Sequence, residues 1–265
     1  MTLVVAHRGS SGAHAEHTLT AYEKAVEEGA DALECDVRLT RDGVLVCVHD
    51  RRVDRTSDGR GVVSTLELAE LAELNFASWK AQQGDPLLEA SWEDYDRDQG
   101  MVLTLERLVQ FALSHDRRVE LHIETKHPTR YGGLVERALI DLLERYQLVA
   151  PPAGEKSQVT VMSFAPTSLR RIHAMAPELP TVYLMARVPL RYRDGSLPPR
   201  IPIAGPSLAV LLSHPRYVER VHEMGNRVHV WTVDEKADIA AMLHLGVDAV
   251  ISNHPTRVLH QLDRR

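Results

Sequence analysis

Acidic and apolar residues alternate in the segment LECDVR at 33–38, and a histidine closes the apolar run that follows it. Successive side chains of a β-strand point to opposite faces, so Glu34 and Asp36 would share one face of a strand. On their own, such acids more often line a solvated strand face. Their carboxylate oxygens are also hard ligands, which suit Mg²⁺ or Ca²⁺ better than Zn²⁺. We therefore treat both as candidate metal ligands.

The sequence TRDGV at 40–44 is a turn signal between two strand patterns and predicts a β-hairpin. A turn centred between residues 41 and 42 would pair Asp36 with Cys47 and Glu34 with His49. These four side chains would then share one face. A slip of one residue would mix polar and apolar side chains, so the pattern supports this register. The opposite face would carry Leu33, Cys35, Val37, Val46 and Val48.

A second strand pattern, RVELHIETKHP at 118–128, also carries polar side chains at alternate positions. Glu124 and Lys126 stand near its carboxyl end, and His122 would lie beneath Glu124. The first apolar run, VVAHRG, likewise ends in His7 and Arg8. Three carboxylates brought together without a cation would repel one another, and at least one would take up a proton. Glu124 is therefore the third candidate metal ligand.

The cationic and imidazole side chains complete a chemical pattern. Arg8 can bind a phosphate group through two hydrogen bonds, and Lys126 can act on it as a point charge. A histidine side chain ordinarily has a pKa near neutrality, so we expect His7 and His49 to serve as acid and base on either side of a phosphorus centre. Taken alone, Lys126 is equally consistent with an ordinary strand lysine, and His49 is consistent with a surface histidine. Together these residues predict metal-assisted cleavage of a phosphodiester.

Short apolar runs that alternate with amphipathic helical segments predict an α/β fold built from parallel βα units. About eight such units in 265 residues is the size of a (β/α)₈ TIM-type barrel, and the hairpin near the second strand accounts for a ninth strand. A doubly wound sheet is the alternative, but HRGSSGAH at 7–14 is not a Gly-rich phosphate loop. The candidate helices cover 19–29, 103–113, 134–146, 217–225 and 235–246. The candidate strands are Leu3–Ala6, Ala32–Val37, Val44–Val48, Arg118–Ile123, Gln158–Met162, Pro180–Met185, Leu208–Leu212, Arg227–Trp231 and Ala249–Ile251.

We expect a single barrel domain over residues 1–265, although this length alone would also allow two small domains. Residues 51–100 break the alternation of strands and helices, which predicts an insertion within the barrel. Residues 187–206 are rich in Pro and Arg and predict an excursion on the surface.

Net charge, cysteine content and the distribution of apolar residues limit the expected binding partners and cellular compartment. A net charge of -6 argues against a non-specific nucleic-acid binder and leaves a small molecule as the expected partner. Cys35 and Cys47 predict two buried thiols rather than a disulfide framework. The opening MTLVVAHRG lacks a leader pattern, and no run approaches the ~18 apolar residues of a transmembrane helix, so we expect a cytoplasmic protein. Assembly of identical chains into an oligomer is left open.

In these motifs and their order, the chain resembles the glycerophosphodiester phosphodiesterase family nearly from end to end. That family carries an H-R-G opening, an acidic E-x-D strand, an H-D pair and an E-x-K strand. Residues 51–71 resemble the insertion of the family, HVWTVD at 229–234 resembles its late aromatic strand, and GVDAVISNHP at 246–255 resembles its closing strand. The matching motifs are His7-Arg8-Gly9, Glu34-Cys35-Asp36, His49-Asp50 and Glu124-Thr125-Lys126.

The resemblance implies hydrolysis of glycerophosphodiesters, such as glycerophosphocholine or glycerophosphoethanolamine, to sn-glycerol 3-phosphate and an alcohol with a divalent metal. It implies attack by the glycerol 2-hydroxyl, a cyclic phosphate that water opens, and an exchange of acid and base roles between His7 and His49. Which histidine starts as the base is left open. Glu16 stands where the family has a carboxylate near the metal and substrate, and Trp231 stands where a substrate contact is expected, although a core aromatic is the default for Trp231.

The chain departs from the family in two motifs. Ala15-Glu16-His17-Thr18 replaces the common P-E-N-T, so His17 stands in the place of an asparagine. Ser252-Asn253-His254-Pro255 replaces the frequent T-D-R-P. We expect the second change to alter the rim of the site without touching a catalytic residue.

Two other functions stay open. One is a lysophospholipase D-like activity, for which a loop such as Arg187–Pro206 would supply an apolar or membrane-facing rim. The other is a barrel that binds phosphoesters without cleaving them, against which the pair of histidines argues.

Overall fold

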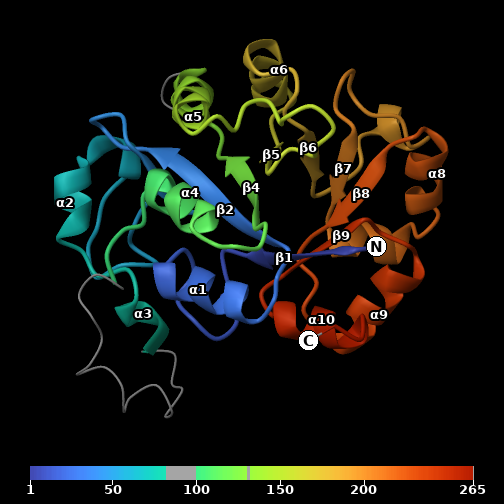
Figure 1. The fold of residues 1–265 in the computed structure, drawn as a ribbon, viewed down its shortest axis with the longest axis horizontal. Helices are drawn as coiled ribbons and strands as arrows, with labels where there is room; N and C mark the ends of the chain where they lie inside the picture. Colours follow the sequence, from blue (N-terminus) through green and yellow to red (C-terminus); the bar gives the residue numbers. More distant parts are fainter. Residues whose placement is uncertain (82–99, 130–131, 265) are drawn as a thin grey trace.

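The computed structural model describes residues 1–81, 100–129 and 132–264 of the chain (Figure 1). Within these residues, eight parallel strands close into a barrel, because β1 pairs with both β2 and β9. The (β/α)₈ prediction is thus confirmed. The barrel strands are β1 Leu3–His7, β2 Ala32–Leu39, β4 Glu120–Thr125, β5 Val159–Ser163, β6 Thr181–Met185, β7 Ile203–Pro206, β8 Arg227–Val230 and β9 Ala249–Ser252.

The strands are apolar on both sides because one side fills the barrel and the other packs under helices. In β1, Val5 belongs to an inner cluster with Val182 and Ile251. Its neighbours Val4 and Ala6 belong to the two clusters between the strands and the helices. An ionisable side chain at an inward position therefore stands where an apolar core residue would otherwise pack.

Helices lie around the outside of the strands in Figure 1. Two of them begin at threonine caps: Thr18 accepts a hydrogen bond from the Ala21 amide, and Thr104 one from the Arg107 amide, which satisfies free N–H groups of the first turn. All five candidate helices are confirmed. The helices around the barrel are α1 Leu19–Glu27, α4 Leu105–Leu113, α5 Leu134–Arg145, α6 Pro166–Met175, α7 Leu208–Ser213, α8 Tyr217–Glu223, α9 Lys236–His244 and α10 Pro255–Gln261.

The hairpin exists, but its predicted register is wrong by one residue. Strand β3, Leu45–Cys47, runs antiparallel to β2 and pairs Cys47 with Val37 rather than with Asp36. The reason is the turn: Gly43 adopts a left-handed φ of 85°, and the Thr40 amide donates to the Val44 carbonyl across a three-residue loop. Cys47 therefore packs with the outer core, both cysteines are free and buried, and His49 lies beyond the strand.

The seventh strand was predicted in the wrong place. Residues 208–212, LAVLL, begin helix α7, and the strand lies just before them at Ile203–Pro206. An apolar run this short does not distinguish a strand from a buried helix by its pattern. A strand ending in Gly and Pro also looks like a loop, but Gly205 is needed because a Cβ there would lie 2.8 Å from the side chains of Val182 and Leu184. The predicted excursion 187–206 therefore includes a barrel strand.

Part of the expected insertion lies within the described residues. Helices η1 Val63–Thr65, α2 Leu68–Ala72 and α3 Ser78–Ala81 follow β3. Val63 of η1 and Leu71 of α2 belong to a separate apolar cluster, which also contains Val46 of β3 and the following Val48. Residues 82–99 of the predicted insertion lie outside the described residues, so its boundaries, like the single domain, stay predictions. In the part of the chain that the structure describes, no helix is long and apolar enough to cross a membrane.

Candidate active site

A cavity of ≈ 110 Å³ opens where the barrel strands end. His7 and Glu124 stand at the carboxyl ends of β1 and β4, the position at which barrel enzymes place their catalytic groups, and Glu34 of β2 is paired with His7. Seven of the nine predicted site residues line the cavity: His7, Arg8, Glu34, His49, Glu124, Lys126 and Trp231. Asp36 and Glu16 contact these residues from behind the lining. Apolar side chains of Met162, Phe164, Leu184 and Ile251 complete the wall.

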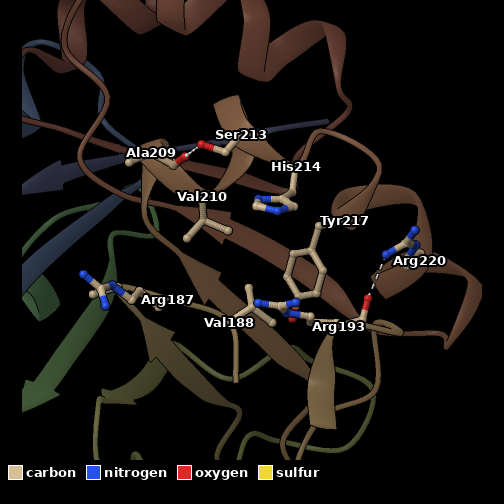
Figure 2. A pocket seen from close by; sticks show the side chains of 10 residues that line it. Arg187, Val188, Arg193, Ala209, Val210, Ser213, His214, Tyr217 and Arg220 are labelled. Atoms are coloured by element: carbon tan, nitrogen blue, oxygen red, sulfur yellow. Dashed lines mark hydrogen bonds between the residues drawn. The ribbon is translucent and has the colours of Figure 1, made fainter. Parts of the chain in front are cut away.

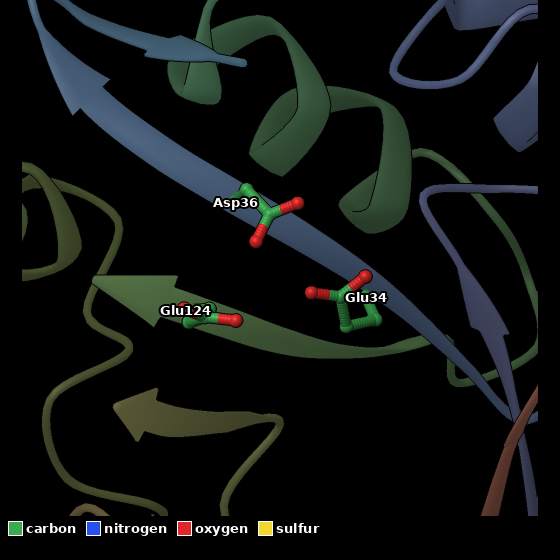
Figure 3. Close-up of side chains that lie close together, drawn as sticks. All are labelled: Glu34, Asp36 and Glu124. Carbon is green, nitrogen blue, oxygen red and sulfur yellow. The ribbon is translucent and has the colours of Figure 1, made fainter. Parts of the chain in front are cut away.

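The three predicted metal ligands converge. One oxygen each from Glu34, Asp36 and Glu124 lies within 4.8 Å of the others, and Figure 3 shows the carboxylates of β2 and β4 turned toward one space. Asp36 and Glu124 are neighbours across the β2–β4 pairing, which fixes their approach. All three side chains are buried. The cluster could hold a divalent metal ion.

The charge balance of this cluster favours a bound cation. Burial and the nearby charge of Asp36 raise the pKa of Glu124 to about 8 and that of Glu34 well above its usual value. Burial would also raise the pKa of Asp36, but the hydrogen bond from His17 and the charges of Arg8 and Lys126 hold it well below its usual value. A divalent ion would stabilise all three carboxylates in their charged form.

Two cations lie against the acids. The Nζ of Lys126 is 3.0 Å from Asp36 Oδ1 and 2.8 Å from Glu124 Oε1, and the Nε of Arg8 is 3.0 Å from Asp36 Oδ2. Arg8 adopts a left-handed φ of 56°, and the following Gly9 has no room for a side chain, since a Cβ would lie 2.6 Å from the carbonyl carbon of Ala21. This turn directs the guanidinium of the H-R-G motif into the site.

His7 is held by a residue that sequence reasoning set aside. Its Nδ1 lies 2.7 Å from Asn253 Oδ1, and the Asn253 Nδ2 donates to Asp234 Oδ2 at 2.7 Å. Because that amide oxygen can only accept, Nδ1 of His7 carries the proton and Nε2 keeps its lone pair. Burial and the charge of Arg8 lower the pKa of His7 to about 4. The expectation that Ser252–Pro255 touches no catalytic residue is therefore wrong.

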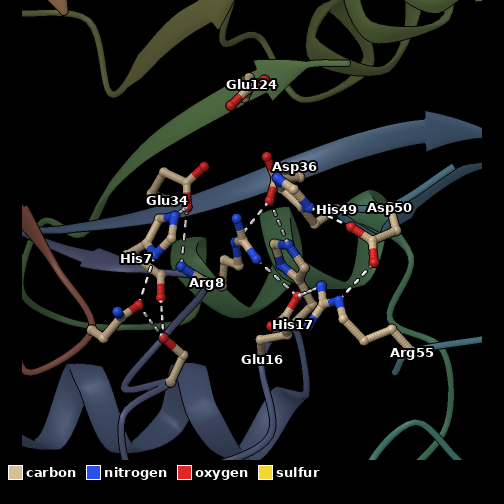
Figure 4. Close-up of polar contacts among 12 residues, drawn as sticks. His7, Arg8, Glu16, His17, Glu34, Asp36, His49, Asp50, Arg55 and Glu124 are labelled. Carbon is tan, nitrogen blue, oxygen red and sulfur yellow. Dashed lines mark hydrogen bonds and ion pairs between the residues drawn. The ribbon is translucent and has the colours of Figure 1, made fainter. Parts of the chain in front are cut away.

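His49 is joined to a second chain of contacts (Figure 4). Its Nδ1 lies 2.6 Å from Asp50 Oδ1, and the Nε of Arg55 donates to Asp50 Oδ2 at 2.6 Å. Arg55 also donates to both oxygens of Glu16, at 2.7 and 2.9 Å. The imidazole thus has a carboxylate behind it, and an arginine of the expected insertion fixes that carboxylate.

Glu16 lies in this network and not in the cavity lining. Its Oε1 accepts a hydrogen bond from Arg8 Nη1 at 2.9 Å in addition to the bond from Arg55. Burial would raise the pKa of Glu16, but the hydrogen bond from Arg55 and the charge of Arg8 lower it to about 2. A permanently charged Glu16 therefore anchors Arg8.

His17, the departure from the family motif, touches the predicted metal site. Its Nε2 lies 3.0 Å from Asp36 Oδ2 and its Nδ1 2.8 Å from the hydroxyl of Tyr22. The Tyr22 hydroxyl donates in turn to the Glu34 carbonyl at 3.0 Å. His17 thereby connects helix α1 to two residues of the acidic strand.

Trp231 forms part of the cavity wall. Its Nε1 donates to the Gly205 carbonyl at 2.7 Å, and its ring meets Phe164 edge to face at a centroid distance of 5.3 Å. His122 lies deeper in the barrel, where its ring stacks on His229 at 5.4 Å. The indole is thus fixed at the cavity, while His122 belongs to the barrel interior.

Sequence reasoning missed Asn253, Asp234 and Arg55 as parts of the site. Arg55 stands in the D-R-T piece of the insertion and Asn253 in the altered closing motif, so both motifs gave a usable signal. Arg55 is connected to His49 through Asp50, and Asn253 contacts His7. Sequence spacing could not predict these contacts, because they join segments up to 246 residues apart.

Comparisons with known proteins agree with this geometry. The model of the "Glycerophosphoryl diester phosphodiesterase family" matches residues 7–257. The chain is 46% identical over 257 residues to the "Probable glycerophosphodiester phosphodiesterase 1" of Mycobacterium tuberculosis, a match that covers 96% of this chain and 90% of that protein. It is 32% identical to the "Glycerophosphodiester phosphodiesterase" of Bacillus subtilis (strain 168), over 96% of this chain and 84% of that protein.

A solved structure of an Oleispira antarctica phosphodiesterase, in complex with the product sn-glycerol-3-phosphate, has a similar fold. It matches this chain with a TM-score of 0.82 and 24% identity, over 99% of this chain and 97% of that one. At this identity the likeness concerns the barrel architecture.

Proposed function

This chain belongs to the glycerophosphoryl diester phosphodiesterase family and is a phosphodiesterase, and we propose that it hydrolyses glycerophosphodiesters such as glycerophosphocholine and glycerophosphoethanolamine to sn-glycerol 3-phosphate and an alcohol. The observation that carries the proposal is the meeting of three carboxylates, two histidines and two cations at one cavity. This set binds a phosphate oxyanion and supplies a proton donor and a proton acceptor.

A divalent ion, Mg²⁺ or Ca²⁺, fits the carboxylates of Glu34, Asp36 and Glu124. The donor set supports this assignment, since it is all oxygen, and burial together with the charge of Asp36 raises the pKa values of Glu34 and Glu124. When bound, the ion supplies positive charge to the phosphoryl oxygens and acidifies a hydroxyl beside it.

The phosphate group is bound by Arg8 and Lys126, whose charged ends lie at the same cavity. Arg8 is held in place by Glu16 and Asp36, so its guanidinium is positioned before substrate arrives. Such fixed charge favours the transition state because it needs no reorganisation during the reaction.

The partners of the two imidazoles divide the proton-transfer roles. His7 has a neutral amide at Nδ1 and a free lone pair at Nε2, which makes it the initial base. Burial and the charges of Arg8 and Lys126 lower the pKa of His49, whereas Asp36 and the Asp50 carboxylate at Nδ1 raise it. A carboxylate partner, which His7 lacks at Nδ1, stabilises a ring that carries an extra proton, so we assign His49 as the initial acid.

The reaction then runs in two steps. His7 takes the proton of the glycerol 2-hydroxyl, whose oxygen attacks phosphorus, while the alcohol leaves with a proton from His49. The product is a cyclic phosphate. His49 next takes a proton from water, whose oxygen attacks phosphorus, and His7 returns its proton to the 2-oxygen as that bond breaks. Both histidines end in their starting states.

The test is a coupled assay for glycerol 3-phosphate release from glycerophosphocholine, with EDTA and then with metal added back. His7→Ala and His49→Ala should each lower kcat by about 10²–10⁴-fold. His244→Ala, an exposed histidine on α9, is the matched control and should leave kcat unchanged. Near-normal turnover in either active-site variant would remove the proposed roles, and full activity in EDTA would remove the metal.

A second arm of this assay addresses lysophospholipids. A long-chain lysophospholipid should be cleaved far more slowly than glycerophosphocholine, because a cavity of ≈ 110 Å³, with Trp231 and Phe164 in its wall, is small for a long acyl chain. Faster cleavage of the lysophospholipid would instead favour the lysophospholipase D-like function.

A further inference from the structure

We propose that a second cavity, outside the active site, binds an anionic amphiphile, meaning a small molecule with a phosphate or carboxylate head and an apolar portion. Six residues define this arginine pocket: Arg187, Val188, Arg193, Val210, Tyr217 and Arg220 (Figure 2). It lies between the connection from β6 to β7 and the helices α7 and α8.

The arginine pocket is large enough for a ligand and separate from the catalytic groups. Its volume is ≈ 540 Å³, within the range of about 300–1,000 Å³ typical of small-molecule sites. None of its lining residues lines the active-site cavity. A ligand here would therefore not need Arg8 or Lys126.

The charge of the arginine pocket selects an anion. Among the described residues, no carboxylate forms an ion pair with Arg187, Arg193 or Arg220, whereas Arg8, Arg55, Arg171 and Arg264 each have one. The nearby Asp194 accepts hydrogen bonds from the amide and hydroxyl of Ser196. Arg220 Nη1 donates to the neutral carbonyl of Arg193 at 3.0 Å, so all three guanidinium groups lack a carboxylate partner among the described residues. They repel a cation and provide N–H donors that phosphate and carboxylate accept.

A buried hydroxyl gives a second, independent sign of a ligand. Tyr217 is only 3% exposed, and its hydroxyl has no hydrogen-bond partner within residues 1–81, 100–129 and 132–264. Figure 2 shows the ring extending toward Val188 and Arg193, into the arginine pocket. Buried polar groups in folded proteins are almost always paired, so an acceptor from outside the chain would satisfy this donor. Burial raises the pKa of Tyr217 to about 12, which keeps the hydroxyl protonated.

The apolar part of the ligand has its own surface. Val188 and Val210 line the arginine pocket together with Ala186 and Ala209. The combination of apolar walls with a few convergent polar groups is typical of a site that binds the two ends of an amphiphile differently. Free inorganic phosphate would use only half of these contacts.

Calorimetric titration of the full-length enzyme with n-octyl phosphate tests the proposal, with octanoate as the carboxylate head and octyltrimethylammonium as the cationic counterpart. We expect one of the two anions to bind with a Kd below about 1 mM, and the cation and inorganic phosphate to bind at least ~10-fold more weakly. The tighter of the two anions identifies the head group. Equal binding of the cation, or no binding of either anion, would overturn the proposal.

Variants locate the binding. Arg193→Gln and Tyr217→Phe should each weaken binding of the anion by at least ~5-fold without changing phosphodiesterase activity. Arg200→Gln is the matched control, because Arg200 lies on the same connection, contacts His173 and does not line the arginine pocket. Arg8→Ala should leave anion binding intact. Binding that is lost in Arg8→Ala and kept in Arg193→Gln would place the anion in the active site and refute the proposal.

Discussion

The Nδ1 atom of His7 lies 2.7 Å from the amide oxygen of Asn253, although the two residues stand at opposite ends of the chain. Closure of the barrel brings β9 beside β1 and makes this contact. The Asn253 amide is oriented by Asp234, so its oxygen faces the imidazole. Asn253 thus sets which nitrogen of His7 is free to accept a proton.

Replacing Asn253 should therefore impair proton transfer. Asn253→Leu removes the acceptor at similar size, so His7 loses its fixed tautomer, and kcat should fall about 10–100-fold with little change in KM. Steady-state kinetics on glycerophosphocholine measures this split. Ser11→Ala is the control. It removes a hydroxyl that lies 2.8 Å from Asn253 Oδ1 and 2.7 Å from the His7 carbonyl, but it keeps the contact between His7 Nδ1 and Asn253 Oδ1.

The pH profile separates this role from a merely structural one. A base is active when it is unprotonated, so the acid limb of kcat/KM follows the pKa of His7, which burial lowers to about 4. Asn253→Asp keeps an acceptor but adds a negative charge, which raises that pKa, and the acid limb should move to higher pH. An unchanged profile in Asn253→Asp, with normal kcat in Asn253→Leu, would contradict the assignment.

Metal affinity should depend on Glu124 and not on its neighbour along β4. Glu124→Gln removes one charged ligand, so the Kd for Mg²⁺ or Ca²⁺ should rise about 10–100-fold in calorimetric titration. Glu120→Gln is a matched control on the same face of the strand, where Glu120 pairs with Arg118 at 3.6 Å. Equal affinities of Glu124→Gln and the wild type would exclude Glu124 as a ligand.

Lys126 should affect metal binding and catalysis in opposite directions. Its ammonium contacts Asp36 and Glu124, so it repels a cation held by the same carboxylates. Lys126→Met should tighten metal binding by about 2–10-fold. It should also lower kcat/KM about 100-fold, because the positive charge that Lys126 places beside the phosphate is lost. A fall in both quantities would show that Lys126 orders the carboxylates instead of binding the phosphate.

The barrel and most of the site could be predicted from the sequence, because both depend on short-range patterns. Alternation within β2 and β4 places Glu34, Asp36 and Glu124 on inward faces, and strand ends place His7 and Lys126 at one rim. These inferences need only the period of a strand and the parallel βα arrangement.

The features that could not be predicted from the sequence depend on tertiary contacts. One glycine conformation at residue 43 shifts the hairpin register, and packing of Gly205 against β6 selects the seventh strand over the more apolar run beside it. The second contacts of His7 and His49 also depend on how distant loops meet at the rim. A local pattern contains no information about such meetings.

Glu136 should stabilise the fold in a pH-dependent way. This carboxylate is fully buried on α5, with Arg171 of α6 at 3.0 Å and His127 at 3.3 Å. Burial would raise its pKa, but hydrogen bonds from His127, Ser168 and Arg171 lower it to about 2. A carboxyl group with a lowered pKa contributes stability above its unfolded value of about 4.3, and this contribution is lost as the pH falls toward 2.

Glu136→Gln should therefore lower the free energy of unfolding by about 2–3 kcal/mol at pH 7, and the difference from the wild type should shrink as the pH falls from about 4.5 toward 2. Urea denaturation followed by circular dichroism measures both. Glu144→Gln, an exposed position on the same helix, should change stability by less than about 0.5 kcal/mol at every pH. A constant difference for Glu136→Gln across this range would show that its cost comes from altered packing, since only the loss of a charged group follows the titration of the carboxylate.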